Sequence, residues 1–351
     1  MGLLAFRFAV TSSSRRLALA VAVVCAAGWV IVACARWIER SAPDPSSDLD
    51  VPRVFHPQSD QSYDVLARTP AGGVPILSYH YFREGLTPER VLRVLGAVLL
   101  SMPTLPDRDY WTTSVPEFDR EMRWLHDRGY RTITCDELAD WLDGKAPRPE
   151  RAVVLTIDDG DESFVRLAVP VLRRYGFKAT VFFLTGLAGA RDWNELNLVG
   201  WDTLRKLEAE GVIRVESHTH NLHTKVRRNG EAVPLFLVSY RDAAGRPSSA
   251  SPLVRDLRAS RDAIRRELGH DTSFLAWPFG FGEAPVDSLA YAEGFRRILT
   301  LSPRRNRRDY RAAWEEPPTA SLGRYAITAR TSFRIFRLMV EGAPATHPAR
   351  S

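Results

Sequence analysis

The sequence has 351 residues, of which 45% are hydrophobic and 26% are charged, so it is long enough to bury a core in one large domain or two modest ones. Its formal net charge is +6, but no zinc-finger spacing or aromatic–basic signature accompanies that charge, which argues against a nucleic-acid partner. Of its three cysteines only Cys135 lies in the body of the chain. An internal disulfide framework and a multi-cysteine zinc site are therefore excluded there.

The chain opens with an apolar segment of membrane-spanning length. Leu17–Ala35 has no charged residue, and its 19 residues extend roughly 28 Å as a helix, near the hydrocarbon thickness of a bilayer. The arginines before it predict that the N-terminus stays inside and the body outside. A signal anchor, a lipoprotein signal that would make Cys34 the lipidated first residue, and a cleaved secretory peptide all stay open. We expect a targeting segment over 1–40, a linker over 41–72, attachment to a membrane, and a body in the cell envelope outside the cytoplasm.

From residue 73 onward, strand-like and helix-like segments alternate. The expected strands cover residues 74–80, 152–157, 179–184, 212–217, 273–277 and 297–301, and the expected helices cover 88–100, 115–129, 136–142, 164–175, 201–210 and 253–268. Strands that are apolar on both faces are typical of a parallel sheet. The alternation predicts an α/β fold with right-handed crossovers. A barrel is favoured over an open sheet, because no glycine-rich dinucleotide fingerprint is present.

Two adjacent carboxylates, Asp158 and Asp159, directly follow the strand that ends at Ile157. In parallel α/β barrels, the C-terminal ends of the strands carry the active site. Adjacent side chains of an extended chain point to opposite sides, so one carboxylate can bind a metal ion while the other serves as a base. Asp-Asp-Gly is also common in turns, and alone it does not decide between the two interpretations.

A histidine-rich stretch follows another strand end. His218, His220 and His223 are three of the eight histidines of the chain. Imidazole together with a carboxylate binds Zn, Co, Ni or Fe. A strand end followed by a turn can bring His218 and His223 together, whereas His218 and His220, on one strand face, form a rival ligand pair. A surface histidine cluster is the alternative without a function.

Two further strand ends carry aromatic or histidine residues. Tyr79-His80 ends the first strand, and Trp277-Pro278-Phe279-Gly280 follows a later one. The second motif predicts an aromatic wall and a tight turn, although core packing explains it equally well. A lone histidine is usually structural, but His80 lies at a strand end, where active-site residues gather.

Together these motifs resemble the polysaccharide deacetylase family (carbohydrate esterase family four). Thr156–Gly160 resembles its Thr-Phe-Asp-Asp-Gly signature, and Ser217-His218-Thr219 followed by His223 resembles its histidine motif. The five-residue histidine spacing and the Pro75–His80 opening are similar to the poly-β-1,6-N-acetyl-D-glucosamine N-deacetylases of biofilm systems. The resemblance implies a deformed (β/α) barrel for a domain over residues 73–345.

The resemblance also implies a role for each candidate residue. One divalent metal ion, of a kind that the sequence does not reveal, would be held by Asp159, His218 and His223. Asp158 would be the general base, and His80 the acid that protonates the leaving amine. The implied reaction is the hydrolysis of N-acetyl groups on an extracellular N-acetylglucosamine polymer. The alternatives are a peptidoglycan or chitin-oligomer deacetylase and a non-catalytic polysaccharide-binding module.

Two roles of the family are less well defined in this sequence. A backbone N–H near Asp161 or Glu162 would help to stabilise an oxyanion. Trp277 stands where many relatives carry an arginine that orients the base. The sequence therefore leaves the orienting residue unassigned.

Overall fold

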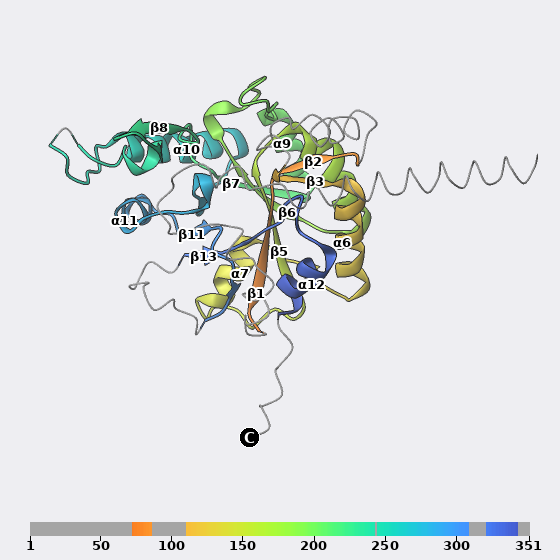
Figure 1. Cartoon of the computed structure of the whole chain (residues 1–351). Coiled ribbons are helices and arrows are strands. Elements are labelled where there is room, and N and C mark those ends of the chain that lie inside the picture. The colour runs from red at the N-terminus through yellow and green to blue at the C-terminus, as the bar shows by residue number, and fades with distance from the viewer. Residues whose placement is uncertain (1–71, 86–109, 243, 309–320, 343–351) are drawn as a thin grey trace, which may run out of the picture. The chain divides into compact units, whose positions relative to one another are not determined.

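The computed structural model describes residues 72–85, 110–242, 244–308 and 321–342 (Figure 1). The chain divides into two units. One comprises Met1–Pro43 and Leu86–Leu105 and lies outside the described residues. The other comprises Asp44–Gly85 and Pro106–Ser351 and contains every described residue.

Some of the sequence predictions concern residues that the structure does not describe. These are the targeting segment over 1–40, the linker up to residue 71 and the helix over 88–100. The domain boundaries therefore stay predictions. In the described part of the chain, no helix has both the length and the apolar character needed to cross a bilayer.

The main element of the fold is a parallel sheet. Its strands follow one another in the order β12 (Arg305–Asn306), β1 (Val74–Tyr79), β5 (Ala152–Asp159), β6 (Ala179–Phe183), β7 (Ile213–Ser217), β10 (Phe274–Ala276), β11 (Arg297–Thr300) and β13 (Leu322–Gly323). Along this path only β12 runs antiparallel to its neighbour, β1. The six strands expected from apolar runs are all present, each within two residues of its predicted bounds.

The sheet closes through one short stretch of chain. β13 pairs with β11, whereas β14 (Tyr325–Ala326) pairs with β1 in a register that aligns Tyr325 with Leu77. Because only Arg324 separates β13 from β14, this stretch joins β13, the last strand of the path, to β1 at its other end. The strands thus form the predicted deformed barrel.

Alternate strand residues point into the barrel, and a short helix covers them from one end. Val74, Ala152 and Phe274, near the starts of their strands, form one apolar cluster with α7 (Cys135–Leu142). Thr134 caps α7 in a capping box with Glu137. The cluster also includes the α7 side chains Leu138 and Trp141; burial of each contributes roughly 1.5–3 kcal/mol. β4 (Arg131–Thr132), which precedes α7, pairs parallel with β5.

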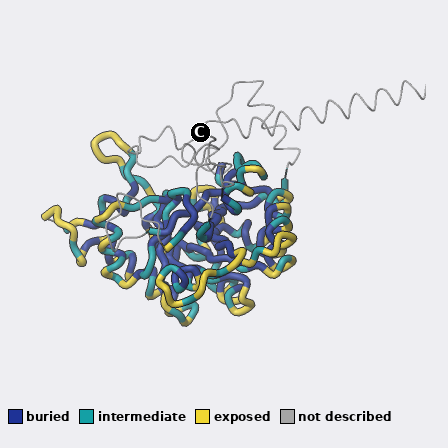
Figure 2. Tube along the Cα trace, turned by 90° about the horizontal axis from the view of Figure 1, so that it is seen from below, coloured by how far each residue is buried: buried dark blue, intermediate teal, exposed yellow. Residues whose placement is uncertain are grey.

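Helices cover the outer face of the barrel (Figure 1). They are α6 (Val115–Asp127), α8 (Val169–Tyr175), α9 (Trp201–Ala209), α10 (Pro252–Leu268), α11 (Ala284–Ala292) and α12 (Phe333–Glu341). The largest apolar cluster lies between β1, β5 and β6 and the helices α6, α8 and α12, and another lies beneath α10 and α11. Figure 2 shows this buried interior beneath exposed loops.

The predicted crossover helix over 164–175 is not α-helical throughout. It begins with a π-helical turn, η2 (Phe164–Ala168), in which the Val169 N–H donates to the Phe164 carbonyl. Pro170 accounts for the wider turn, because proline lacks the N–H that an α-helix needs and its ring clashes with the carbonyl four residues earlier.

Short elements surround the C-terminal ends of the strands. β2 (Tyr81–Arg83) pairs parallel with β3 (Thr112–Ser114), and β8 (Lys225–Arg228) forms an antiparallel hairpin with β9 (Glu231–Pro234). Three 3-10 turns, η3 (Thr185–Leu187), η4 (Leu235–Leu237) and η5 (Pro278–Gly280), lie in the connections. Residues of β2, β8 and η5 reach the pocket described next.

Candidate metal centre and active site

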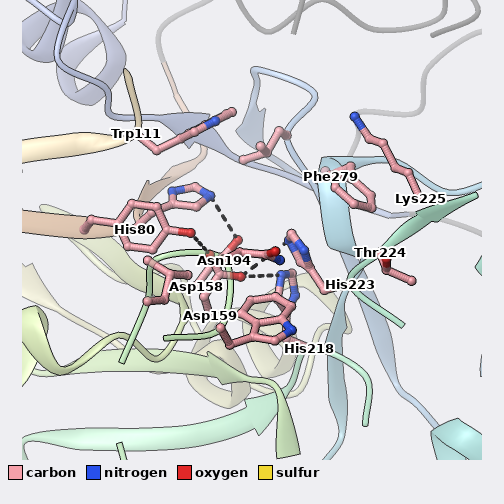
Figure 3. Close-up of a pocket in the computed structure, with 15 residues that line it drawn as sticks. His80, Trp111, Asp158, Asp159, Asn194, His218, His223, Thr224, Lys225 and Phe279 are labelled. Atoms are coloured by element: carbon pink, nitrogen blue, oxygen red, sulfur yellow. Dashed lines mark hydrogen bonds and ion pairs between the residues drawn. The ribbon is translucent and has the colours of Figure 1, made fainter. Parts of the chain in front are cut away.

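A cavity of about 410 Å³ opens at the C-terminal ends of the strands. All five residues singled out from the sequence line it: His80, Asp158, Asp159, His218 and His223 (Figure 3). They come from β1, β5 and β7 or from the residues just after these strands. Strand ends far apart in the sequence are neighbours here, because β1, β5, β6 and β7 are adjacent and parallel.

The two adjacent carboxylates share this cavity, which differs from the expectation that they point to opposite sides. Asp159 has a φ of 68°, so the backbone leaves the extended conformation at its second carboxylate. Gly160 follows with a φ of 88°, and a Cβ there would lie 2.4 Å from the Phe183 ring. Glycine is therefore required at this turn. The turn brings both carboxylates to one pocket, although their hydrogen-bond partners differ: Asp158 is bonded to Arg324 and Asp159 to Tyr81.

Asp159, His218 and His223 surround one point. Asp159 Oδ1 lies 3.4 Å from His218 Nε2 and 3.5 Å from His223 Nε2. All three ligand atoms lie within 4.8 Å of one another. Asp159 Oδ1 is buried and has no hydrogen-bond partner among the described residues. A buried, orphaned carboxylate oxygen facing two imidazole nitrogens fits a divalent ion, and this donor set suits Zn, Co, Ni or Fe.

Neighbouring groups orient two of these ligands. His218 Nδ1 donates to the Ala276 carbonyl at 2.7 Å. That bond fixes the tautomer, so the Nε2 lone pair points toward Asp159. The Tyr81 hydroxyl donates to Asp159 Oδ2 at 2.5 Å, which leaves Oδ1 as the oxygen that faces the histidines.

Asp158 is held by a different partner, Arg324. The buried guanidinium donates to Asp158 Oδ1 at 2.6 Å and to Thr156 Oγ1 at 3.3 Å. Burial opposes ionisation of Asp158, but Arg324, His218 and His80 outweigh it and lower the pKa of this carboxyl. Asp158 is thus kept as a carboxylate without being part of the three-residue group around Asp159.

Sequence reasoning missed Arg324. The residue expected at the orienting position, Trp277, is buried and stacks on Phe236, and its indole N–H donates to Asp287 at 2.6 Å. Arg324, which lies between β13 and β14, contacts the candidate base Asp158 in its place. No motif surrounds it, so only the barrel closure could have indicated that it lies beside Asp158.

His80 lies on the other side of Asp158. Its Nε2 is 3.8 Å from Asp158 Oδ2, and its ring lies against Trp111 with the ring centroids 4.5 Å apart. Burial lowers the pKa of His80, although Asp158 and Asp159 oppose that shift. The pKa of His223 is lowered to about 4, again chiefly by burial. Neutral imidazoles are the form that binds metal ions and accepts protons.

His220, the rival ligand, does not join the group around Asp159. Its Nδ1 lies 3.0 Å from the Thr185 hydroxyl instead. The strand ends at Ser217, so His218 and His220 do not share a strand face. The turn that follows the strand brings the His223 side chain to the group around Asp159.

The walls of the cavity are partly as predicted. Phe279 lies against His223 with the ring centroids 4.5 Å apart, and Trp193 meets the same imidazole edge-on. Trp277 belongs to the core instead of the wall, because the strand alternation turns it outward beneath α10 and α11. The Glu162 N–H donates to the Asn197 carbonyl at 2.7 Å, so it is not the expected oxyanion donor.

Residues 145–298 match the family described as polysaccharide deacetylase. The poly-β-1,6-N-acetyl-D-glucosamine N-deacetylase of Staphylococcus aureus (strain MSSA476) is 24% identical over 170 residues, which cover 48% of this chain and 54% of that protein. The Staphylococcus epidermidis protein of the same name is 29% identical over 164 residues, 47% of this chain and 52% of that one. The chain spans about half the length of these curated relatives.

Solved structures agree on the fold. The de-N-acetylase from Aggregatibacter actinomycetemcomitans superposes with a TM-score of 0.58 at 23% identity, over 76% of this chain and 100% of that one. IcaB from Ammonifex degensii gives a TM-score of 0.55 at 23% identity, over 78% of this chain and 98% of that one. The solved structures thus share the fold of this chain, and its residues 145–298 match the polysaccharide deacetylase family. Within that family, the relatives that it matches are named as poly-β-1,6-N-acetyl-D-glucosamine N-deacetylases.

Proposed function

We propose that the protein is a metal-dependent N-deacetylase that acts on extracellular poly-β-1,6-N-acetyl-D-glucosamine. One observation carries the proposal. The Asp158 carboxylate, held by Arg324, lies beside the group of Asp159, His218 and His223, whose ligand atoms face one point. Amide hydrolysis needs a base for water and electrophilic help for the carbonyl, and the two groups divide these tasks.

The ligands in this proposal are Asp159, His218 and His223. A divalent ion bound to them supplies Lewis-acid polarisation of the acetamide carbonyl and of the attacking water. Tyr81 and the Ala276 carbonyl keep two of the ligands oriented. Outer partners of this kind commonly change metal affinity by roughly 10–100-fold.

Proton transfer falls to Asp158 and His80. Asp158 accepts the proton of water as it attacks the carbonyl carbon, and Arg324 stabilises the negative charge that Asp158 carries before that step. Asp158 then passes this proton to the neutral His80, and the imidazolium so formed donates it to the departing nitrogen when the C–N bond breaks. The products are acetate and a free amine on the sugar. His80 lies near enough to Asp158 for the two to share one substrate.

The substrate assignment rests on the cavity walls and on the relatives. Trp111, Trp193 and Phe279 present ring faces and edges, as sugar-binding sites commonly do, around the candidate centre. The curated relatives carry the name of a poly-β-1,6-N-acetyl-D-glucosamine N-deacetylase. We also propose that the apolar segment at residues 17–35 exports the domain and attaches it to the membrane, which places it where such a polymer occurs.

The experiment compares acetate release from three polymers. Purified protein receives poly-β-1,6-N-acetyl-D-glucosamine, chitin oligomers or peptidoglycan, with and without added Zn²⁺ or Co²⁺. We expect metal-dependent release, fastest from the β-1,6 polymer. Faster release from peptidoglycan or chitin would reassign the substrate. Binding to a polymer without acetate release under any condition would support the non-catalytic module instead.

A further inference from the structure

The loop between the two histidines has an unusual backbone. Thr219 has a φ of 74°, in the left-handed region. For a β-branched residue this conformation is strained and persists only where the surroundings determine it. The loop directs both His218 and His223 toward Asp159, so its conformation decides whether the three side chains meet.

Every backbone N–H from residue 218 to residue 222 is hydrogen-bonded. Three of these bonds are to neutral groups: His218 to the Phe183 carbonyl at 3.0 Å, Thr219 to Ser217 Oγ at 3.1 Å, and Leu222 to Thr219 Oγ1 at 3.2 Å. The other two are to one carboxylate. His220 N–H donates to Asp256 Oδ1 at 2.7 Å, and Asn221 N–H donates to Asp256 Oδ2 at 2.8 Å. These two bonds are the shortest of the five, as expected for a charged acceptor.

Asp256 is placed for this role by α10. The helix is anchored by the buried side chains of Leu253 and Leu257, on either side of Asp256. Among the described residues Asp256 forms no ion pair, whereas Asp262, further along the same helix, lies 3.3 Å from Arg265. The carboxylate of Asp256 is thus directed at the loop backbone.

The opposite side of the loop is also fixed. Gly186 N–H donates to the His220 carbonyl at 2.8 Å. A Cβ on Gly186 would lie 2.7 Å from that carbonyl oxygen, so the contact admits only glycine. The loop is therefore held between η3 and Asp256.

We propose that Asp256 is a positioning residue: its two hydrogen bonds fix the loop of residues 219–222, so that His218 and His223 face Asp159 together. This inference rests on the proposed function, since the convergence serves to hold a metal ion. A displacement of about 1 Å at either imidazole would remove a nitrogen from bonding distance.

The test uses the full chain with Asp256→Ala, Asp256→Asn and, as a matched control on the same helix, Asp262→Asn. Metal affinity is measured by competition between each variant and a chelator for Zn²⁺. Amide hydrogen exchange of residues 218–223 is followed in metal-free protein. We expect Asp256→Ala to weaken Zn²⁺ binding about ten-fold and to speed exchange of the loop amides by a similar factor. Asp256→Asn keeps one acceptor oxygen. Its Zn²⁺ affinity and its rate of loop amide exchange should therefore lie between those of Asp256→Ala and the wild type.

A second readout separates positioning from general destabilisation. With Zn²⁺ in excess, Asp256→Asn should recover most of the wild-type kcat with an unchanged KM, because the residue does not touch the substrate. Wild-type Zn²⁺ affinity and loop protection in Asp256→Ala would overturn the inference, as would equal effects from Asp262→Asn. If Asp256→Ala does not fold, Asp256→Asn decides. If the wild type releases no acetate, the proposed function fails, and loop exchange still decides the role of Asp256.

Discussion

Arg324 donates a hydrogen bond of 2.6 Å to Asp158 across 166 positions of sequence. The arginine lies at the seam where β13 and β14 close the barrel, and its side chain is fully buried. The closure of the barrel and the charge of the candidate base therefore depend on the same short stretch of chain.

Replacement of Arg324 should change the pH dependence of activity. The guanidinium lowers the pKa of Asp158, so in Arg324→Ala this carboxyl keeps its proton to higher pH and cannot act as a base there. The acid limb of the kcat/KM profile should move upward by about one unit or more. Arg324→Lys should show a smaller shift, because lysine keeps the charge but not the planar donor group. Zn²⁺ affinity serves as the control and should stay near the wild-type value; an acid limb at the wild-type position would contradict the assignment.

Replacement of a ligand should remove metal and activity together. In Asp159→Ala and His218→Ala we expect Zn²⁺ affinity to fall by more than about 100-fold, with acetate release lost in parallel, since each variant leaves only two donors. Metal content after gel filtration, measured by atomic emission, reports the first loss. His126→Ala, which removes an exposed histidine on α6, is the matched control. Full metal content in either ligand variant would overturn the proposed ligand set.

The choice between His220 and His223 can be measured directly. His223→Ala should lose Zn²⁺, because its Nε2 lies 3.5 Å from Asp159 Oδ1. His220→Ala should retain most of its affinity, since that side chain is hydrogen-bonded to Thr185. A larger loss in His220→Ala than in His223→Ala would assign the ligands the other way.

Much of this site could be predicted from the sequence, for a physical reason. Asp158, Asp159, His80 and the histidine stretch each follow an apolar strand, and parallel strands bring their C-terminal ends to one rim. The choice of His223 over His220 depends on a turn at Thr219 whose left-handed φ no propensity predicts. The structure places His223 in the group, but its role as a ligand stays a prediction.

Other features could not be found by local reasoning. β13 and β14 are two residues each, so no periodicity marks them, and Arg324 between them looks like any other arginine in a basic chain. Asp256 occupies an ordinary position on an amphipathic helix. Both residues act through contacts far apart in sequence, and only the tertiary structure brings those contacts together.

A buried acid outside the active site gives a prediction about stability. Glu121 on α6 accepts a hydrogen bond of 2.9 Å from Tyr79, and burial raises its pKa from 4.5 to about 8. The folded state therefore holds a proton that the unfolded state has released between these two values. Stability from this group is present in full below pH 4.5 and is lost as the pH rises to about 8, at roughly 1.4 kcal/mol per unit.

Glu121→Gln should remove that part of the pH dependence. Glutamine is neutral at every pH and can still accept the hydrogen bond from Tyr79. The difference in unfolding free energy between Glu121→Gln and wild type, measured by urea denaturation, should grow in favour of the variant from pH 5 to pH 8. A difference that stays constant over this range would mean that Glu121 ionises normally in the folded protein.

The most direct test of the central claim is acetate release by Asp158→Asn at saturating Zn²⁺. The claim is that Asp158 takes the proton while Asp159, His218 and His223 hold the ion. Asp158→Asn should therefore bind one Zn²⁺ per chain with near wild-type affinity and release acetate from poly-β-1,6-N-acetyl-D-glucosamine at least about 100-fold more slowly. Wild-type release by this variant would contradict the claim.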